Sequence, residues 1–113
     1  MKKLAVAAFA AALATGSAAH SPVESTTPAN GAAVTEVPAE ISLSFANDIR
    51  LTRVEMAHQD HGPVPLDLDG PARFDRTFVL PLQGMGAGTY RIEWRGLGAD
   101  GHAMRGEFSF QVE

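Results

Sequence analysis

The stretch Tyr90-Arg91-Ile92-Glu93-Trp94-Arg95 decides the fold, because its apolar and charged residues alternate strictly. Successive side chains of a β-strand point to opposite faces, so this period of two puts the apolar residues on a core and the charged ones in water. The stretch Glu107-Phe108-Ser109-Phe110-Gln111-Val112 repeats the pattern. Both stretches are predicted to be strands, with Tyr90 and Trp94 in the core.

The chain before these two stretches is predicted to form further short strands separated by turns. A turn at Asn47-Asp48 is expected to divide two of them, and residues 32–39 are expected to be irregular. The predicted strands are 23–27, 41–45, 51–57, 64–68 and 74–80. Turns about every ten residues and the lack of a helical period after the N-terminal segment predict an all-β fold. The expected architecture is an antiparallel immunoglobulin-like β-sandwich with Greek-key connections, preceded by a cleavable signal helix.

The N-terminus has the three parts of a secretory signal. Met1-Lys2-Lys3 is positively charged, residues 4–13 are apolar, and Ser17-Ala18-Ala19 offers small residues to a signal peptidase. A membrane anchor is the alternative, but ten apolar residues rise only about 15 Å as a helix, about half the thickness of a bilayer core. The sequence therefore predicts a Sec-type signal peptide at 1–19 and a mature domain at 20–113 that does not span the membrane.

Composition narrows the compartment and the partners. The chain has 9 Lys plus Arg against 13 Asp plus Glu, and a net charge of −4. This balance argues against a nucleic-acid partner. Cysteine is absent, so an exported domain of this size depends on packing without disulfides. The signal is typical of a protein exported to the bacterial periplasm.

Asp100-Gly101-His102 is a candidate metal site, to which His20 adds further ligands. Cleavage after Ala19 makes His20 the first residue, whose free amine and imidazole close a chelate on one metal ion. Pro22 has no N–H, which excludes the copper-binding mode that uses deprotonated backbone amides. The alternative interpretation of Asp100-Gly101-His102 is an ordinary hairpin turn, because Asp-Gly is a strong turn dipeptide.

The order and spacing of several motifs resemble the bacterial copper resistance protein CopC family over nearly the whole mature chain. These motifs are terminal His20, Ser25-Thr26-Thr27-Pro28-Ala29-Asn30-Gly31, Val37-Pro38-Ala39-Glu40-Ile41-Ser42-Leu43-Ser44-Phe45, Ala87-Gly88-Thr89-Tyr90-Arg91-Ile92-Glu93-Trp94-Arg95, Ala99-Asp100-Gly101-His102 and Gly106-Glu107-Phe108-Ser109-Phe110. The resemblance implies a periplasmic β-sandwich that binds copper(II).

The ligands that the resemblance implies are His20, Asp100 and His102, for one copper(II) ion per mature chain. Some family members have a further carboxylate where this chain has Asn47, and Asp48 is expected to point to the other face of its strand. A set of imidazole, amine and carboxylate ligands suits copper(II), with zinc as the main competitor.

A second, weaker metal site is conceivable in the segment 56–61, which contains His58, Asp60 and His61. The alternative is a solvated polar loop, because the spacing fixes no geometry. Some family members have a methionine-rich loop for copper(I) in the comparable region. With one methionine here, that site is expected to be missing or weak.

The expected function is non-catalytic: copper(II) is sequestered, or handed to a membrane transporter such as an inner-membrane CopD-like protein. Two alternatives stay open at this point. One is a small copper oxidase or monooxygenase-like enzyme that uses the N-terminal histidine chelate. The other is a metal-free immunoglobulin-like interaction module.

Overall fold

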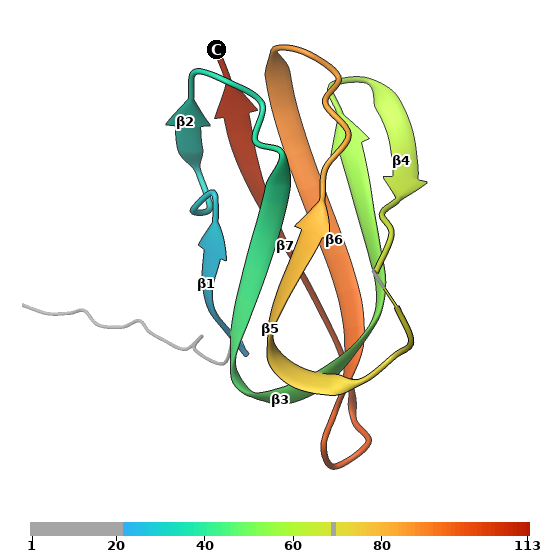
Figure 1. Ribbon diagram of the computed structural model, residues 1–113. Helices are drawn as coiled ribbons and strands as arrows, with labels where there is room; N and C mark the ends of the chain where they lie inside the picture. The colour runs from blue at the N-terminus through green and yellow to red at the C-terminus, as the bar shows by residue number, and fades with distance from the viewer. Residues whose placement is uncertain (1–21, 69) are drawn as a thin grey trace, which may run out of the picture.

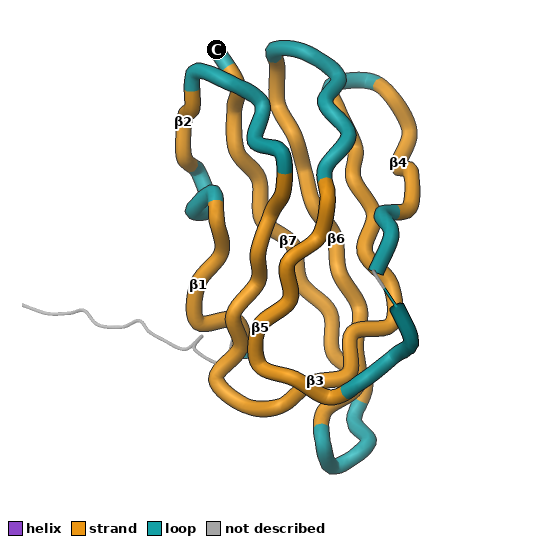
Figure 2. Tube along the Cα trace, viewed as in Figure 1, coloured by secondary structure: helices purple, strands orange, loops and turns teal. Residues whose placement is uncertain are grey.

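The fold is known from a computed structural model that describes residues 22–68 and 70–113. The predicted signal peptide and His20 lie outside the described residues. Every element in the described part is a strand (Figures 1 and 2). The strands are β1 (Val23–Thr27), β2 (Ala32–Val34), β3 (Glu40–His58), β4 (His61–Pro65), β5 (Phe74–Pro81), β6 (Gly88–Gly98) and β7 (Ala103–Val112). The all-β prediction is confirmed.

The long strand β3 connects the two layers of the sandwich. Its first part pairs with β1 and β5, and its second part pairs with β4 and β6. The predicted turn that divides 41–45 from 51–57 is wrong: β3 is continuous and curves strongly at this point (Figure 1). Its pairing with β5 shifts register between Ser44 and Ile49, and the residues 46–48 are all exposed, so the alternation of buried and exposed residues stops there.

The second layer continues from β6 to β7 and ends with β2. β6 and β7 are antiparallel neighbours, whereas β2 runs parallel to β7. The expectation that 32–39 is irregular is therefore wrong for Ala32–Val34. The turn before β2 explains its position, because the Gly31 N–H donates to the Ser109 carbonyl at 2.7 Å and so places the following residues beside β7.

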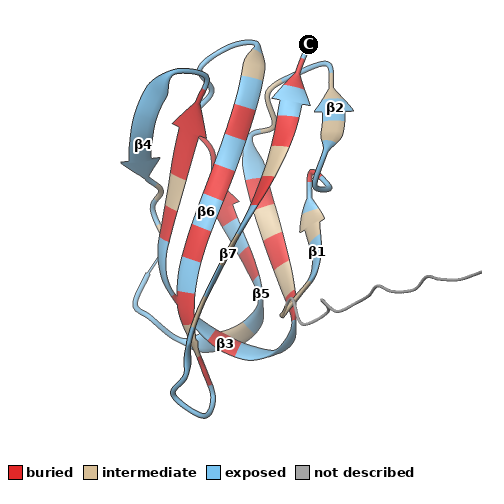
Figure 3. Ribbon diagram, turned by 180° about the vertical axis from the view of Figure 1, so that it is seen from behind, coloured by how far each residue is buried: buried red, intermediate tan, exposed pale blue. Residues whose placement is uncertain are grey.

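The core consists of the apolar residues that alternate along β3, β5, β6 and β7. Figure 3 shows the resulting bands of buried and exposed residues on β6. Tyr90 and Trp94 are 0% and 2% exposed, which confirms their predicted place in the core. The Trp94 ring meets Phe45 edge to face at 5.1 Å, and the Tyr90 ring stacks on Phe110 at 5.1 Å. Burial of each such ring stabilises the fold by about 1.5–3 kcal/mol.

The glycine-rich connection between β5 and β6 is attached to the core by one hydroxyl. The Tyr90 OH accepts a hydrogen bond from the Met85 N–H at 2.8 Å and donates one to the Gly86 carbonyl at 2.7 Å. This connection and the β3–β4 turn lie at one end of the sandwich, and the β6–β7 hairpin lies at the other (Figure 1). In the described part of the chain, no helix has the length and apolar character needed to cross a membrane.

Candidate metal centre

The hairpin between β6 and β7 presents Asp100 and His102 at one end of the domain. Two backbone hydrogen bonds of 2.9 Å close the turn, one from Gly98 N–H to the His102 carbonyl and one from Gly101 N–H to the Gly98 carbonyl. Gly101 has φ = +88°, a left-handed conformation that glycine adopts without the steric cost of a Cβ atom. The turn interpretation of the sequence is thus correct, and the turn brings two ligand-type side chains together.

Asp100 and His102 bond directly to each other. The His102 backbone N–H donates to Asp100 Oδ1 at 3.0 Å, and the His102 Nδ1–H donates to Asp100 Oδ2 at 2.8 Å. The ring hydrogen bond from His102 is the main reason that the pKa of Asp100 lies below its usual value, and the Asp100 carboxylate raises the pKa of His102. Both side chains are exposed, so a metal ion has open access to them.

A hollow of about 310 Å³ lies beside Asp100, and residues from three separate segments line it, whereas His102 is not part of its lining. Pro22 precedes β1, Asn47 and Asp48 belong to β3, and Asp100 belongs to the hairpin. The Pro22 carbonyl accepts a hydrogen bond from the Ala46 N–H at 3.0 Å, which fixes the start of the described chain against β3. The segment that follows the predicted cleavage site therefore borders the same hollow as Asp100.

The position of Asp48 differs from the sequence expectation. Asp48 and Asn47 both line the hollow, although they are consecutive in a strand. The register shift of β3 between Ser44 and Ile49 removes the strict alternation on which the expectation depended. Asp48 Oδ1 also lies 3.9 Å from Arg76 Nε on the exposed surface. The sequence interpretation placed Asp48 on the other face because it assumed strict alternation there, although the same residues had been predicted to form a turn.

Met104 is a second neighbour of the hairpin that sequence reasoning did not connect with it. It packs against the core, and it also lines the hollow beside Asp100. Within residues 22–68 and 70–113, no cluster of three or more His, Cys, Asp or Glu side chains is arranged to hold a metal ion. The hairpin supplies two ligand-type side chains, and further ligands must come from elsewhere.

His58 and His61 lie at the opposite end of the domain from Asp100, so they form no part of the same centre (Figure 1). The interpretation of a solvated polar loop is wrong for His58, which ends β3 and is 6% exposed. Its Nε2–H donates to the Ala87 carbonyl at 2.8 Å, and its ring packs on Tyr90 at 4.6 Å. The His58 Nδ1 atom is buried without a partner among the described residues, and the exposed His61 ring lies 6.1 Å away.

Comparison with known proteins identifies the family of the chain. Residues 23–113 match the family described as CopC domain. The chain is 28% identical to copper resistance protein C of Pseudomonas syringae pv. tomato and 30% identical to copper resistance protein C of Escherichia coli. Each alignment covers 84% of this chain and 82% of the relative.

Solved structures show the same fold. The crystal structure of CopC from Methylosinus trichosporium OB3b superposes with a TM-score of 0.68 at 22% identity, over 83% of this chain and 94% of that one. PcoC, a methionine-rich copper resistance protein from Escherichia coli, superposes with a TM-score of 0.59 at 30% identity, over 84% of this chain and 100% of that one. The β-sandwich prediction is confirmed, and the chain belongs to the CopC family.

Proposed function

We propose that this protein is an exported copper(II)-binding protein of bacterial copper resistance. In the proposed centre, one copper(II) ion per mature chain is bound by the amine and imidazole of His20, the carboxylate of Asp100 and the imidazole of His102. Membership of the CopC family, together with relatives named as copper resistance proteins, supports copper as the cargo.

The hollow beside the hairpin is the observation that carries the proposal. It is bordered by Asp100 and by Pro22, and Pro22 is two residues from His20. Two residues of extended chain span at most about 7 Å, so the amine of a chain that begins at His20 starts within reach of the hollow. Asn47 borders the same hollow and offers an amide oxygen in place of a carboxylate.

The chemistry of these groups suits copper(II). Nitrogen and oxygen donors hold copper(II) more tightly than other first-row divalent ions. Every ligand must be deprotonated to bind, and Asp100, with its lowered pKa, is ionised at neutral pH. His102 has a raised pKa, so protons compete with copper from a higher pH than at an isolated imidazole. Copper affinity therefore falls as the pH drops through and below neutrality.

The proposal includes the location and the route of the metal. The signal sequence supports export to the periplasm, where the protein sequesters copper(II) or hands it to an inner-membrane copper transporter of the CopD-like kind. The protein is non-catalytic in this account, because Asp100 adds a ligand at a position that oxygen chemistry needs open. His58 and His61 remain a separate prediction of a weaker second site.

The test combines mass analysis of the exported protein with a copper(II) titration followed by electron paramagnetic resonance. The expected results are a mature chain that begins at His20, one tightly bound copper ion and nitrogen couplings from two imidazoles and one amine. His102→Ala is expected to remove one nitrogen coupling and weaken binding at least tenfold, whereas the matched change His61→Ala leaves the main signal unchanged. A spectrum unaffected by His102→Ala would remove the hairpin from the centre.

A further inference from the structure

Gly98, the last residue of β6, opens a small space beside the proposed copper centre. Gly98 does not have a left-handed φ angle, so its backbone conformation does not require glycine. A Cβ atom at this position would lie 3.0 Å from Asp100 Oδ1, 3.1 Å from Met104 Cε and 3.7 Å from Met104 Sδ. The absence of a side chain at Gly98 is therefore what lets the Asp100 carboxylate and the Met104 thioether come together.

The Asp100 oxygen and the Met104 sulfur are close to each other as well as to the hollow that both residues line. Both atoms are measured from one point, so they are no farther apart than 3.0 Å and 3.7 Å combined. Met104 lies opposite Gly96 on β6, so no side chain at that position holds Met104 away from Gly98. A methionine side chain is unbranched and adaptable, so its sulfur can move towards an ion that Asp100 binds.

Met104 differs from the other groups at the centre in the metal that it prefers. Amine, imidazole and carboxylate groups suit copper(II), whereas a thioether selects copper(I). The chain has no cysteine, so its sulfur ligands are thioethers. Met56 is only 1% exposed, and Met85 lies in the glycine-rich connection at the opposite end of the domain (Figure 1). In the described part of the chain, Met104 is the one methionine that borders the hollow beside Asp100.

We propose that Met104 is a further ligand of the centre and that it allows the site to hold copper(I) as well as copper(II). The inference rests on the proposed function, because Asp100 and His102 place the ion at the hairpin. In the copper(II) form, the bonds to His20, Asp100 and His102 dominate. In the copper(I) form, the Met104 sulfur and the His102 imidazole bind the ion. Copper therefore stays at the same end of the domain in either oxidation state.

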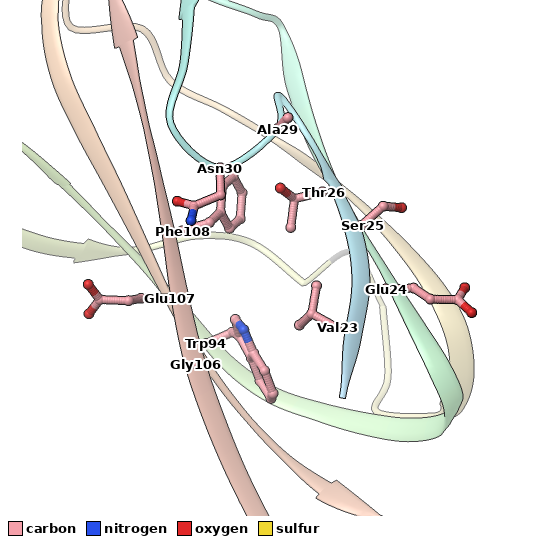
Figure 4. Close-up of a pocket in the computed structure, with 10 residues that line it drawn as sticks. All are labelled: Val23, Glu24, Ser25, Thr26, Ala29, Asn30, Trp94, Gly106, Glu107 and Phe108. Atoms are coloured by element: carbon pink, nitrogen blue, oxygen red, sulfur yellow. The ribbon is translucent and has the colours of Figure 1, made fainter. Parts of the chain in front are cut away.

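Two other features are candidates for binding a soft metal ion, and the structure separates both from the centre. The larger groove between β1 and β7, of about 490 Å³, has no methionine or histidine among its lining residues, so it offers no soft ligand (Figure 4). Met85 is 39% exposed and lines a hollow with Met56, but that hollow shares no residue with the one beside Asp100. Met85→Leu is therefore the matched control for Met104→Leu, since each change replaces a thioether by an alkyl group of similar volume.

The first test adds silver(I), a redox-inert ion with the ligand preferences of copper(I), to the mature chain in chloride-free buffer. The methionine methyl groups are labelled with ¹³C, and the two leucine variants assign the resonances of Met85 and Met104. The Met104 methyl resonance is expected to shift in a saturable way that is complete at one equivalent of silver(I). A Met104 methyl resonance that does not respond to silver(I) overturns the inference, whatever the response of Met85.

The second test measures the copper(I) and copper(II) affinities separately, each by competition with a chromophoric chelator, and without oxygen for copper(I). Met104→Leu is expected to lower the copper(I) affinity by about tenfold or more and the copper(II) affinity by less than about threefold. Met85→Leu is expected to change neither affinity. Equal losses for the two ions in Met104→Leu, or a copper(I) loss of the same size in Met85→Leu, would overturn the inference.

The proposed function and this inference fail in different ways. If His102→Ala leaves copper(II) binding unchanged, the proposed centre itself is wrong. If copper(II) binding depends on His102 but the copper(I) affinity of Met104→Leu equals that of the unaltered chain, the centre stands and the role of Met104 is wrong.

Discussion

Removal of the Tyr90 hydroxyl tests how the glycine-rich connection is held to the core. In Tyr90→Phe the Met85 N–H loses its acceptor at 2.8 Å and the Gly86 carbonyl loses its donor at 2.7 Å. Each net hydrogen bond contributes about 0.5–1.5 kcal/mol, so the variant is expected to lose about 2 kcal/mol of unfolding free energy. The ring keeps its stacking on Phe110, so the loss comes from the hydroxyl and not from packing.

Urea denaturation of the mature domain, followed by tryptophan fluorescence, measures this loss. For a domain of this size, about 2 kcal/mol corresponds to a decrease of about 8–16 °C in Tm. The matched control is Thr52→Val, which removes an exposed hydroxyl bonded to the Arg95 carbonyl at 3.2 Å and is expected to cost less than about 0.5 kcal/mol. Copper(II) affinity is expected to stay unchanged, because the connection and the hairpin lie at opposite ends. A loss for Tyr90→Phe no larger than that for Thr52→Val would refute the reasoning.

Three further predictions concern the hairpin, the contact between Gly106 and Trp94, and the metal. Asp100→Asn is expected to lower the pKa of His102 toward about 6.5 in an NMR titration, because the carboxylate raises it. A pKa of His102 that is the same with and without the Asp100 carboxylate would contradict the ion pair. The pair stabilises the fold only between the two pKa values, because it is lost as the pH falls through the lowered pKa of Asp100 or rises through the raised pKa of His102. Gly106→Val is expected to displace the Trp94 ring, because a Cβ atom at position 106 would lie 2.8 Å from it, and to lower the free energy of unfolding by about 1–3 kcal/mol. Unchanged tryptophan fluorescence and unchanged stability would contradict the close approach of Gly106 to Trp94. Copper(II) at about 100 times Kd is expected to stabilise the mature domain by about 2.7 kcal/mol, and a chelator to reverse this; an unaltered Tm argues against binding to the folded state.

The sequence predicted which residues are inside, but not all the neighbours of each strand. Alternation in 90–95 and 107–112 encodes an inner and an outer face, and Tyr90 and Trp94 are buried accordingly. Alternation contains no information about which strands pair, so the parallel placement of β2 beside β7 was not predicted. The turn residues Asn47-Asp48 suggested a chain reversal, whereas they mark the bend at which β3 passes from one layer to the other.

The site was predictable where its residues are adjacent in sequence and less so where pairing brings them together. The turn at Asp100-Gly101-His102 follows from local chemistry, and the structure adds the direct bond between the two side chains. The approach of Pro22 to Asp100 depends on the pairing of β1 with β3, which no local pattern reveals. His58 seemed to belong to a polar loop, but it is buried at the end of β3, where Nε2–H donates to the Ala87 carbonyl and Nδ1 has no partner among the described residues.

The most direct test of the proposed centre compares copper(II) binding by two forms of the domain that differ by one residue. One form begins at His20, and the other carries a single glycine before it, which converts the terminal amine into a peptide nitrogen and leaves Asp100 and His102 unchanged. The account predicts tight copper(II) binding by the first form and a loss of at least a hundredfold in the second. Equal affinity of the two forms would contradict a centre built on the N-terminal amine.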